Sequence, residues 1–334
     1  MAHTHGLAGS RDLKIADRIS EAMKLRRDRL EFDTPSLNAL PSMWREFVTM
    51  TEGLYPLSQM HALLILKHLA GRFDVLIDSY GGALYRRQIK KFIEPRINPK
   101  LDIAEQVLPY ELTALVLSPL LKKEVQNELK EASRRALRDY YDTTQDIANI
   151  GDKFDLYYAD QTAALRDSIS ANLQMNFLTV RQPLMNQKAL DAVRRLPSSL
   201  RRKEGIHKYI IGHCYSKLEH FSVDYSGYPA PYRGFSALRL VAPAAERVIG
   251  FGDRFIPSLK RVSLRRPPMD VKNILVPGMS LMKELLLTPH PLYDSLIERG
   301  TLERAIKDIS GGDFGFAPAI LQLLTFRLFL DIFF

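Results

Sequence analysis

Residues 57–82 of this 334-residue chain, LSQMHALLILKHLAGRFDVLIDSYGG, decide its fold. Apolar side chains at helical spacing over residues 57–70 predict a helix, and Gly71 is placed to end it. The apolar run over residues 73–78 predicts a buried strand, which leads into a turn at Gly81 and Gly82. A helix and a strand joined by so short a connection are typical of a parallel α/β sheet.

The segments on either side extend this pattern. Residues 10–25 predict a helix that begins at Ser10, a favourable N-cap, and residues 30–32 predict a short extended piece. From residue 101 onwards the apolar spacing is mainly helical. We therefore predict an α/β fold, in which a partial parallel sheet is followed by a mainly helical C-terminal region. Ligands bind at the carboxyl ends of strands in such sheets, so the double-glycine turn is a candidate site. A turn that needs glycine for backbone reasons alone is the alternative.

Composition narrows the class of protein without choosing a function. The chain is 46% hydrophobic and 25% charged, which predicts a folded globular protein. Its formal net charge of +9 favours polyanionic partners such as nucleotides, pyrophosphate, RNA or an anionic membrane. The basic residues occur only in short bursts, so we expect a solvated basic face and no nucleic-acid partner.

The single cysteine, Cys214, allows no disulfide within the chain and fits a reducing compartment, so we expect a cytoplasmic protein. Residues 314–334 are the most apolar stretch, but Gln322, Arg327 and Asp331 interrupt it. We therefore expect no membrane span and predict a buried closing helix, with an amphipathic helix at a membrane surface as the alternative.

Four segments, in order, resemble pieces of the synthetase domain of the asparagine synthetase family. Residues 4–12, THGLAGSRD, are similar to the family's T-x-G…S-x-D pattern before a helix. Residues 78–85, DSYGGALY, are similar to its strand-end D-G-x-G-G-D-E-L-F motif. Residues 176–186, NFLTVRQPLMN, resemble S-x-E-V-R-x-P-F-L-D, and residues 205–211, GIHKYII, resemble G-x-x-K-x-x-L. The apolar C-terminal segment also resembles the family's terminal helix.

The resemblance implies a fold and an activity. The fold would be a partial adenine-nucleotide-hydrolase-like parallel sheet. Residues 1–98 would be the remnant of the α/β nucleotide-binding layer, and residues 99–334 the mainly helical remainder of the same domain. The activity implied is ATP-dependent amidation of a small-molecule carboxylate through an acyl-adenylate, as in asparagine biosynthesis by the glutamine-hydrolysing ligase. ATP and Mg²⁺ are the cofactors expected for that family.

The same resemblance implies site residues. Lys208 and Arg181 match the family's cations and would stabilise charge on the leaving pyrophosphate. The alternatives are an exposed lysine near a helix start and an arginine in a structural ion pair. The positions implied to bind the cofactor are Gly81, Gly82, Asp78, Ser10 and Asp12. No residue is expected to bind a metal: His213, Cys214 and His220 lack the spacing of a zinc site, and His3 and His5 are interpreted as incidental residues of a frayed terminus.

The departures from the family predict impaired activity. Ala83 and Leu84 stand where the strand-end motif has acidic residues, Thr179 replaces a glutamate, and Asn186 replaces an aspartate. The chain contains neither the S-G-G-x-D-S nucleotide loop nor, with Ala2 after Met1, the N-terminal cysteine of the glutaminase domain. Without that loop the phosphates of ATP lose a cradle of N–H groups. We therefore expect a truncated, divergent domain that is impaired or inactive alone.

Two other functions stay open. The chain could be one subunit of a split ATP-dependent amide ligase, completed by a partner chain that supplies the loop. It could instead be a non-catalytic, basic helical module that binds a protein or RNA. Loss of a central strand would leave an apolar edge beside residues 73–77, and we expect a homodimer or a partner chain to cover it.

Overall fold

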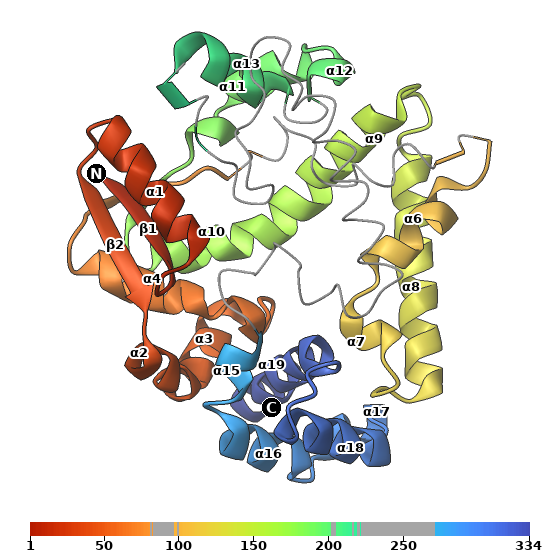
Figure 1. The fold of residues 1–334 in the computed structure, drawn as a ribbon. Coiled ribbons are helices and arrows are strands. Elements are labelled where there is room, and N and C mark those ends of the chain that lie inside the picture. The colour runs from red at the N-terminus through yellow and green to blue at the C-terminus, as the bar shows by residue number, and fades with distance from the viewer. Residues whose placement is uncertain are drawn as a thin grey trace. The chain divides into compact units, whose positions relative to one another are not determined.

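The computed structural model describes residues 1–80, 82, 97–98, 100–201, 205–215, 217–218, 221 and 271–334. The chain divides into two compact units. Figure 1 labels the helices and strands and colours them from the N-terminus to the C-terminus. The first unit consists of Met1–Asp33 and Glu204–Asp270, and the second of Thr34–Lys203 and Val271–Phe334. The predicted boundary at residue 98 falls inside the second unit. The division into a nucleotide-binding layer and a helical remainder stays a prediction.

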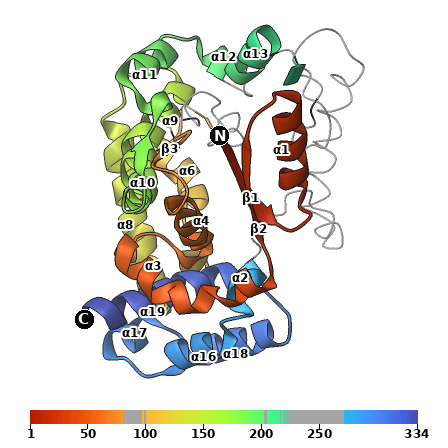
Figure 2. The same cartoon turned by 90° about the vertical axis from the view of Figure 1, so that its left-hand side faces the viewer.

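The first unit begins with a strand, a helix and a second strand. β1 (Ala2–Leu7) and β2 (Arg27–Phe32) pair in parallel, with Ala2 opposite Arg27 and Leu7 opposite Phe32. α1 (Arg11–Ala22) connects them and packs beside β1 (Figure 2). The Ser10 hydroxyl accepts the N–H of Leu13 at 3.5 Å and so caps α1, as predicted. The unit also contains α13 (Gly205–Cys214).

Two glycines shape the connection from β1 to α1. Gly9 has a φ of +71°, in the left-handed region that glycine adopts without strain. A Cβ at Gly6 would lie 2.9 Å from the Ser10 hydroxyl oxygen, which is too close. The position of the Ser10 hydroxyl that caps α1 therefore requires a glycine at residue 6.

The second unit opens with α2 (Thr34–Asn38), the 3₁₀ turn η1 (Leu40–Met43), α3 (Trp44–Thr51), η2 (Leu57–Gln59) and α4 (His61–Ala70). The predicted helix over residues 57–70 is therefore present, as a 3₁₀ turn followed by an α-helix. Gly71 caps it, as predicted. Leu63, Leu66 and Leu69 place three turns of α4 in the core.

The C-terminal part packs around one nearly buried helix. α19 (Ala317–Phe333) contacts α3, α7 (Ala114–Leu117), α15 (Val271–Leu275) and α16 (Met279–Leu287), while α17 (Pro291–Leu296) and α18 (Arg299–Ser310) complete this part. The prediction of a buried closing helix is confirmed. Within the described ranges, no helix combines the length and the apolar character needed to cross a membrane.

Helices make up the middle of the second unit: α6 (Ile103–Glu111), α8 (Lys123–Asp142), α9 (Ile150–Tyr157), the π-helical run η4 (Tyr158–Asp167) and α10 (Ser168–Met175). Val107, Leu137, Tyr141 and Phe154 form a core between α6, α8 and α9. After α10 follow η5 (Pro183–Met185), α11 (Gln187–Arg194) and α12 (Ser198–Arg201). For the described residues after residue 101, the prediction of a mainly helical region is confirmed.

A short parallel sheet completes the second unit. β3 (Val75–Ile77) pairs with β4 (Thr179–Arg181), with Val75 opposite Thr179 and Ile77 opposite Arg181. Parallel strands within a largely helical chain agree with the broad α/β prediction. The prediction that residues 73–78 form a buried strand is wrong, because Val75 and Ile77 are 52% and 73% exposed. In the described part of the chain this sheet has two strands, and its outer face is not covered.

Candidate functional site at the carboxyl ends of β3 and β4

The two short strands of the second unit end side by side. Asp78 follows β3 directly, and Arg181 is the last residue of β4. The Asp78 N–H donates to the Arg181 carbonyl oxygen at 2.9 Å, so residues far apart in sequence meet at one edge of the sheet. The carboxyl edge of parallel strands is where ligands bind in open α/β sheets. Two of the predicted site residues are thus brought together.

Helix α10 holds the segment that follows β3. The Gln174 side-chain amide donates to the Asp78 carboxylate at 2.5 Å, and the Tyr80 hydroxyl donates to the Ser170 hydroxyl. Ser170 and Gln174 lie one helical turn apart, so one face of α10 contacts two residues of the strand-end segment. The side-chain oxygen of Gln174, Oε1, is buried and has no hydrogen-bond partner within the described structure.

Burial sets the protonation state of Tyr80. Desolvation raises the pKa of its phenol to about 12, the Ser170 hydrogen bond opposes that rise, and the charge of Asp78 adds to it. Tyr80 is therefore a neutral hydrogen-bond donor at neutral pH. It anchors the strand-end segment and is not an acid or base that would exchange a proton there.

The turn at the double glycine is described only in part. The Gly82 N–H donates to the Ser79 carbonyl oxygen at 3.0 Å and closes the turn. A Cβ at Gly82 would make only an ordinary contact of 3.6 Å with Leu184. A side chain at this position is therefore sterically tolerated. Gly81 lies outside the described residues, as do Ala83 and Leu84.

Arg181 is accessible to an anion. Its side chain is exposed, and its guanidinium donates to the Val180 carbonyl oxygen at 3.2 Å. Within the described ranges it forms no ion pair, so the alternative of a structural ion pair finds no support there. An exposed, always charged guanidinium is suited to bind phosphate or carboxylate oxygens.

The residues at the carboxyl ends of β3 and β4 do not by themselves provide a binding site for Mg²⁺. Mg²⁺ requires near-octahedral coordination by oxygen ligands. The described residues of the edge offer one carboxylate, Asp78, and it already accepts a hydrogen bond from Gln174. The carboxylates of the family motif would fall on Ala83 and Leu84, which have none. The residues present therefore do not fit the metal.

The other predicted site residues belong to the first unit. The Ser10 hydroxyl is used as the cap of α1, and Asp12 lies in the first turn of that helix, where a negative charge is favourable. Lys208 lies within α13, and its side chain is outside the described atoms. The predicted site is thus divided between the units, with Asp78, Gly82 and Arg181 in one and Ser10, Asp12 and Lys208 in the other.

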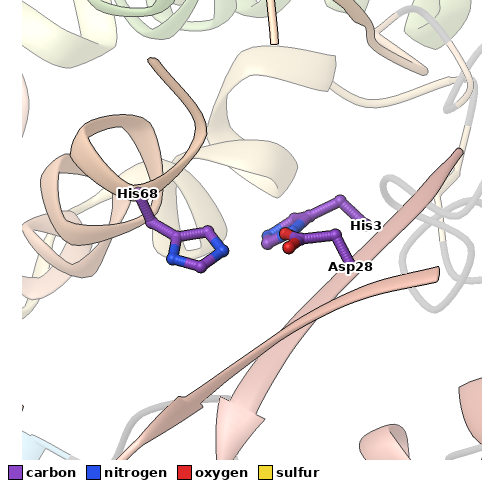
Figure 3. Close-up of side chains that lie close together, drawn as sticks. All are labelled: His3, Asp28 and His68. Carbon is purple, nitrogen blue, oxygen red and sulfur yellow. The ribbon is translucent and has the colours of Figure 1, made fainter. Parts of the chain in front are cut away.

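The sequence motifs did not predict one contact, which is formed by a histidine and an aspartate of the first unit. His3 and Asp28 are register partners on β1 and β2, and the His3 Nδ1 lies 2.7 Å from the Asp28 carboxylate (Figure 3). Asp28 is buried, and the His5 ring stacks on His3 at 5.5 Å. The interpretation of both histidines as residues of a frayed terminus is wrong, because they lie in a paired strand. Their alternate spacing, His-Thr-His, is the signal that could have indicated this.

Among the described residues of the first unit, these side chains do not complete a metal site. A structural zinc site needs four ligands, and a catalytic one at least three from the protein. His68, also labelled in Figure 3, is a residue of α4 in the second unit. His3 and Asp28 therefore form a contact that joins β1 to β2.

The comparisons with known proteins leave the family open. No model of a known protein family matches the chain, and no curated protein matches it. The resemblance to asparagine synthetases therefore rests on the four motif segments of the sequence. Residues 4–12 cover the end of β1 and the start of α1, residues 78–85 follow β3, and residues 176–186 contain β4.

Proposed function

We propose that the chain is a divergent asparagine-synthetase-like domain. We further propose that residues 1–334 alone neither bind ATP·Mg tightly nor form an acyl-adenylate. The observation that supports the ancestry is the meeting of Asp78 and Arg181. Two motifs about a hundred residues apart in the sequence converge on the carboxyl edge of one parallel pair, which is where a ligand site of this fold class would lie.

The proposed chemistry of the ancestor explains what each residue would have done. ATP would activate a carboxylate as an acyl-adenylate with release of pyrophosphate, and ammonia would then displace AMP. Arg181 would bind an anionic oxygen of the leaving group, and Lys208 is proposed for the same role from the first unit. Asp78, held by Gln174, would orient the strand-end turn.

The loss of activity is proposed from the residues that the edge lacks. Ala83 and Leu84 supply no carboxylate, and Asp78 alone does not complete the coordination of Mg²⁺. Residues 1–334 also contain no S-G-G-x-D-S loop. The adenine-nucleotide-hydrolase-like sheet and the cytoplasmic location belong to this same proposal.

Two titrations test it. Calorimetry with ATP·Mg should give no saturable isotherm in the micromolar range, and ATP–pyrophosphate exchange with aspartate should stay at background. A micromolar isotherm accompanied by exchange would contradict the proposed inactivity. Titration with inorganic pyrophosphate tests the ancestry of the edge: R181A should weaken binding, R181K should retain much of it, and R194A, an exposed control on α11, should leave it unchanged. Equal binding by R181A would remove the support from Arg181.

A split ligase is the second candidate, because β3 is left exposed. It predicts that co-expression with a chain carrying S-G-G-x-D-S yields a stable complex with pyrophosphate exchange. A complex without exchange would count against it and favour a structural partner.

A further inference from the structure

One edge of β3 has no strand partner among the described residues, and it is called the open edge below. The Asp74 carbonyl oxygen accepts the Thr179 N–H at 3.0 Å, and the Asp78 N–H donates to the Arg181 carbonyl oxygen at 2.9 Å. Since main-chain groups of successive residues point to opposite sides of a strand, those of Val75 and Ile77 face away from β4. In the part of the chain that the structure describes, no other strand pairs with this side of β3.

The side chains along this strand are apolar and accessible. Val75 and Ile77 are 52% and 73% exposed, and both point to the same face because they are two residues apart. Their register partners Thr179 and Arg181 are exposed on that face as well. An open edge with exposed apolar side chains is a template for pairing with a further strand.

Charge indicates which strand would fit. β3 is bracketed by Asp74 and Asp78, so the segment is acidic at both ends and apolar in the middle. If two copies paired antiparallel with Leu76 opposite Leu76, Asp74 of each copy would lie opposite Asp78 of the other. Two pairs of like charges would result. Like charges directly opposite one another destabilise a strand pair, whereas opposite charges stabilise it.

We propose that the open edge of β3 binds an extended segment of another protein that has an apolar centre and a lysine or arginine at each end. This inference goes beyond the proposed function, because it involves no nucleotide and no amidation. The main-chain groups of Val75 and Ile77 would supply the hydrogen bonds, their side chains the apolar contact, and the two aspartates the charge pairing.

Fluorescence anisotropy of labelled peptides tests the proposal on the full chain. The probe is Gly-Ser-Lys-Val-Thr-Val-Lys-Ser-Gly, and its charge control has glutamate in place of both lysines. We expect saturable binding of the lysine peptide, about tenfold or more weaker binding of the glutamate peptide, and weakening by salt.

Two variants locate the site. V75P removes an N–H that faces away from β4 and is tolerated at a strand edge, so it should abolish peptide binding while circular dichroism and the melting temperature stay near those of the wild type. D74K should weaken the lysine peptide and strengthen the glutamate peptide. D146K, which changes an exposed aspartate in the loop after α8, is the control.

The outcomes are distinguishable. Equal binding of both peptides, wild-type binding by V75P, or loss of binding by D146K as by D74K would overturn the proposal. A homodimer in sedimentation that V75P dissociates would assign the edge to a second copy and overturn it too. Each result is independent of whether the chain binds ATP·Mg.

Discussion

Gly278 lies against the indole ring of Trp44. A Cβ at position 278 would come within 2.5 Å of Cζ2 of that ring, and Trp44 is fully buried. The ring therefore occupies the volume that any side chain at 278 would need. This contact ties the start of α16 to the start of α3.

The first prediction follows from that contact. We expect G278A to lower the free energy of unfolding by about 2 kcal/mol, because the rigid indole cannot move aside in a packed core. The measurement is urea denaturation followed by Trp44 fluorescence. G300A in α18 is the control, since nothing lies within 4 Å of its Cβ; it should be neutral or slightly stabilising. Equal stability of G278A and wild type would show that the ring is free to move.

Gly53 gives a second prediction. Its φ is +68°, and an added Cβ would lie 2.9 Å from Phe329 of α19. G53A should therefore combine backbone strain of about 1 kcal/mol with a clash against the core. G9A, at a φ of +71° with nothing within 4 Å of its Cβ, has the backbone strain without the clash. Thermal denaturation should show the larger loss for G53A, and the same loss in both would exclude a contribution from Phe329.

Arg327 gives a third prediction. It is 4% exposed, pairs with Asp331 at 3.0 Å, donates to the Thr288 carbonyl oxygen at 3.1 Å and lies over the Tyr293 ring. R327A should destabilise the chain by about 3 kcal/mol, because it removes a buried guanidinium that donates to the Thr288 carbonyl oxygen and is the nearer cation of the Asp331 carboxylate. R45A, whose guanidinium is 4.0 Å from Asp331 and largely exposed, should cost well under 1 kcal/mol. Guanidinium denaturation of both variants separates the two cases.

The raised pKa of Tyr80 gives a pH dependence. The phenol ionises near 10 when unfolded and near 12 when folded, so between these values the folded state holds its proton more tightly. Its contribution to stability is present below pH 10 and is lost as the pH rises through 12. Ultraviolet absorbance of phenolate should show fewer tyrosines titrating near 10 in the wild type than after denaturation. Y80F should reduce the alkaline loss of stability, and an unchanged pH profile would contradict the assignment to Tyr80.

The bond between Gln174 and Asp78 gives a fifth prediction. Q174L should loosen the strand-end segment, because α10 then holds it only through Ser170 and Tyr80. Hydrogen exchange at the Asp78 and Gly82 amides should become faster, while exchange in α8 stays unchanged. N172L, on the exposed side of α10, is the matched control. Unchanged exchange at Asp78 would mean that β4 alone fixes the segment.

The elements predicted correctly from the sequence are those with local causes. Ser10 caps α1 because its hydroxyl is three residues from the N–H that it accepts, and α4 follows from leucines one turn apart. The burial of β3 could not be predicted, because the apolar run over residues 73–78 is the same whether or not another layer covers it. Burial of a strand depends on distant segments, and here they leave Val75 and Ile77 exposed.

The ligand-binding role of the candidate site stays a prediction, but the place of two of its residues could be indicated from the sequence. The strand-end motifs indicated Asp78 and Arg181, and the structure places their main chains in contact. Ser170 and Gln174 were missed, since a serine and a glutamine one turn apart on a helix have no distinctive pattern. Their role appears only once α10 lies against the segment after β3.

The pairing of β3 with β4 also has a kinetic consequence. Ala2 and Arg27 pair across 25 residues, whereas Val75 and Thr179 pair across 104. Closing the longer loop costs about 1 kcal/mol more in chain entropy. The pairing of two three-residue strands offsets little of that cost until the intervening helices have folded. We therefore expect the carboxyl edge that joins Asp78 to Arg181 to assemble late in folding, and the β1–α1–β2 segment to form early.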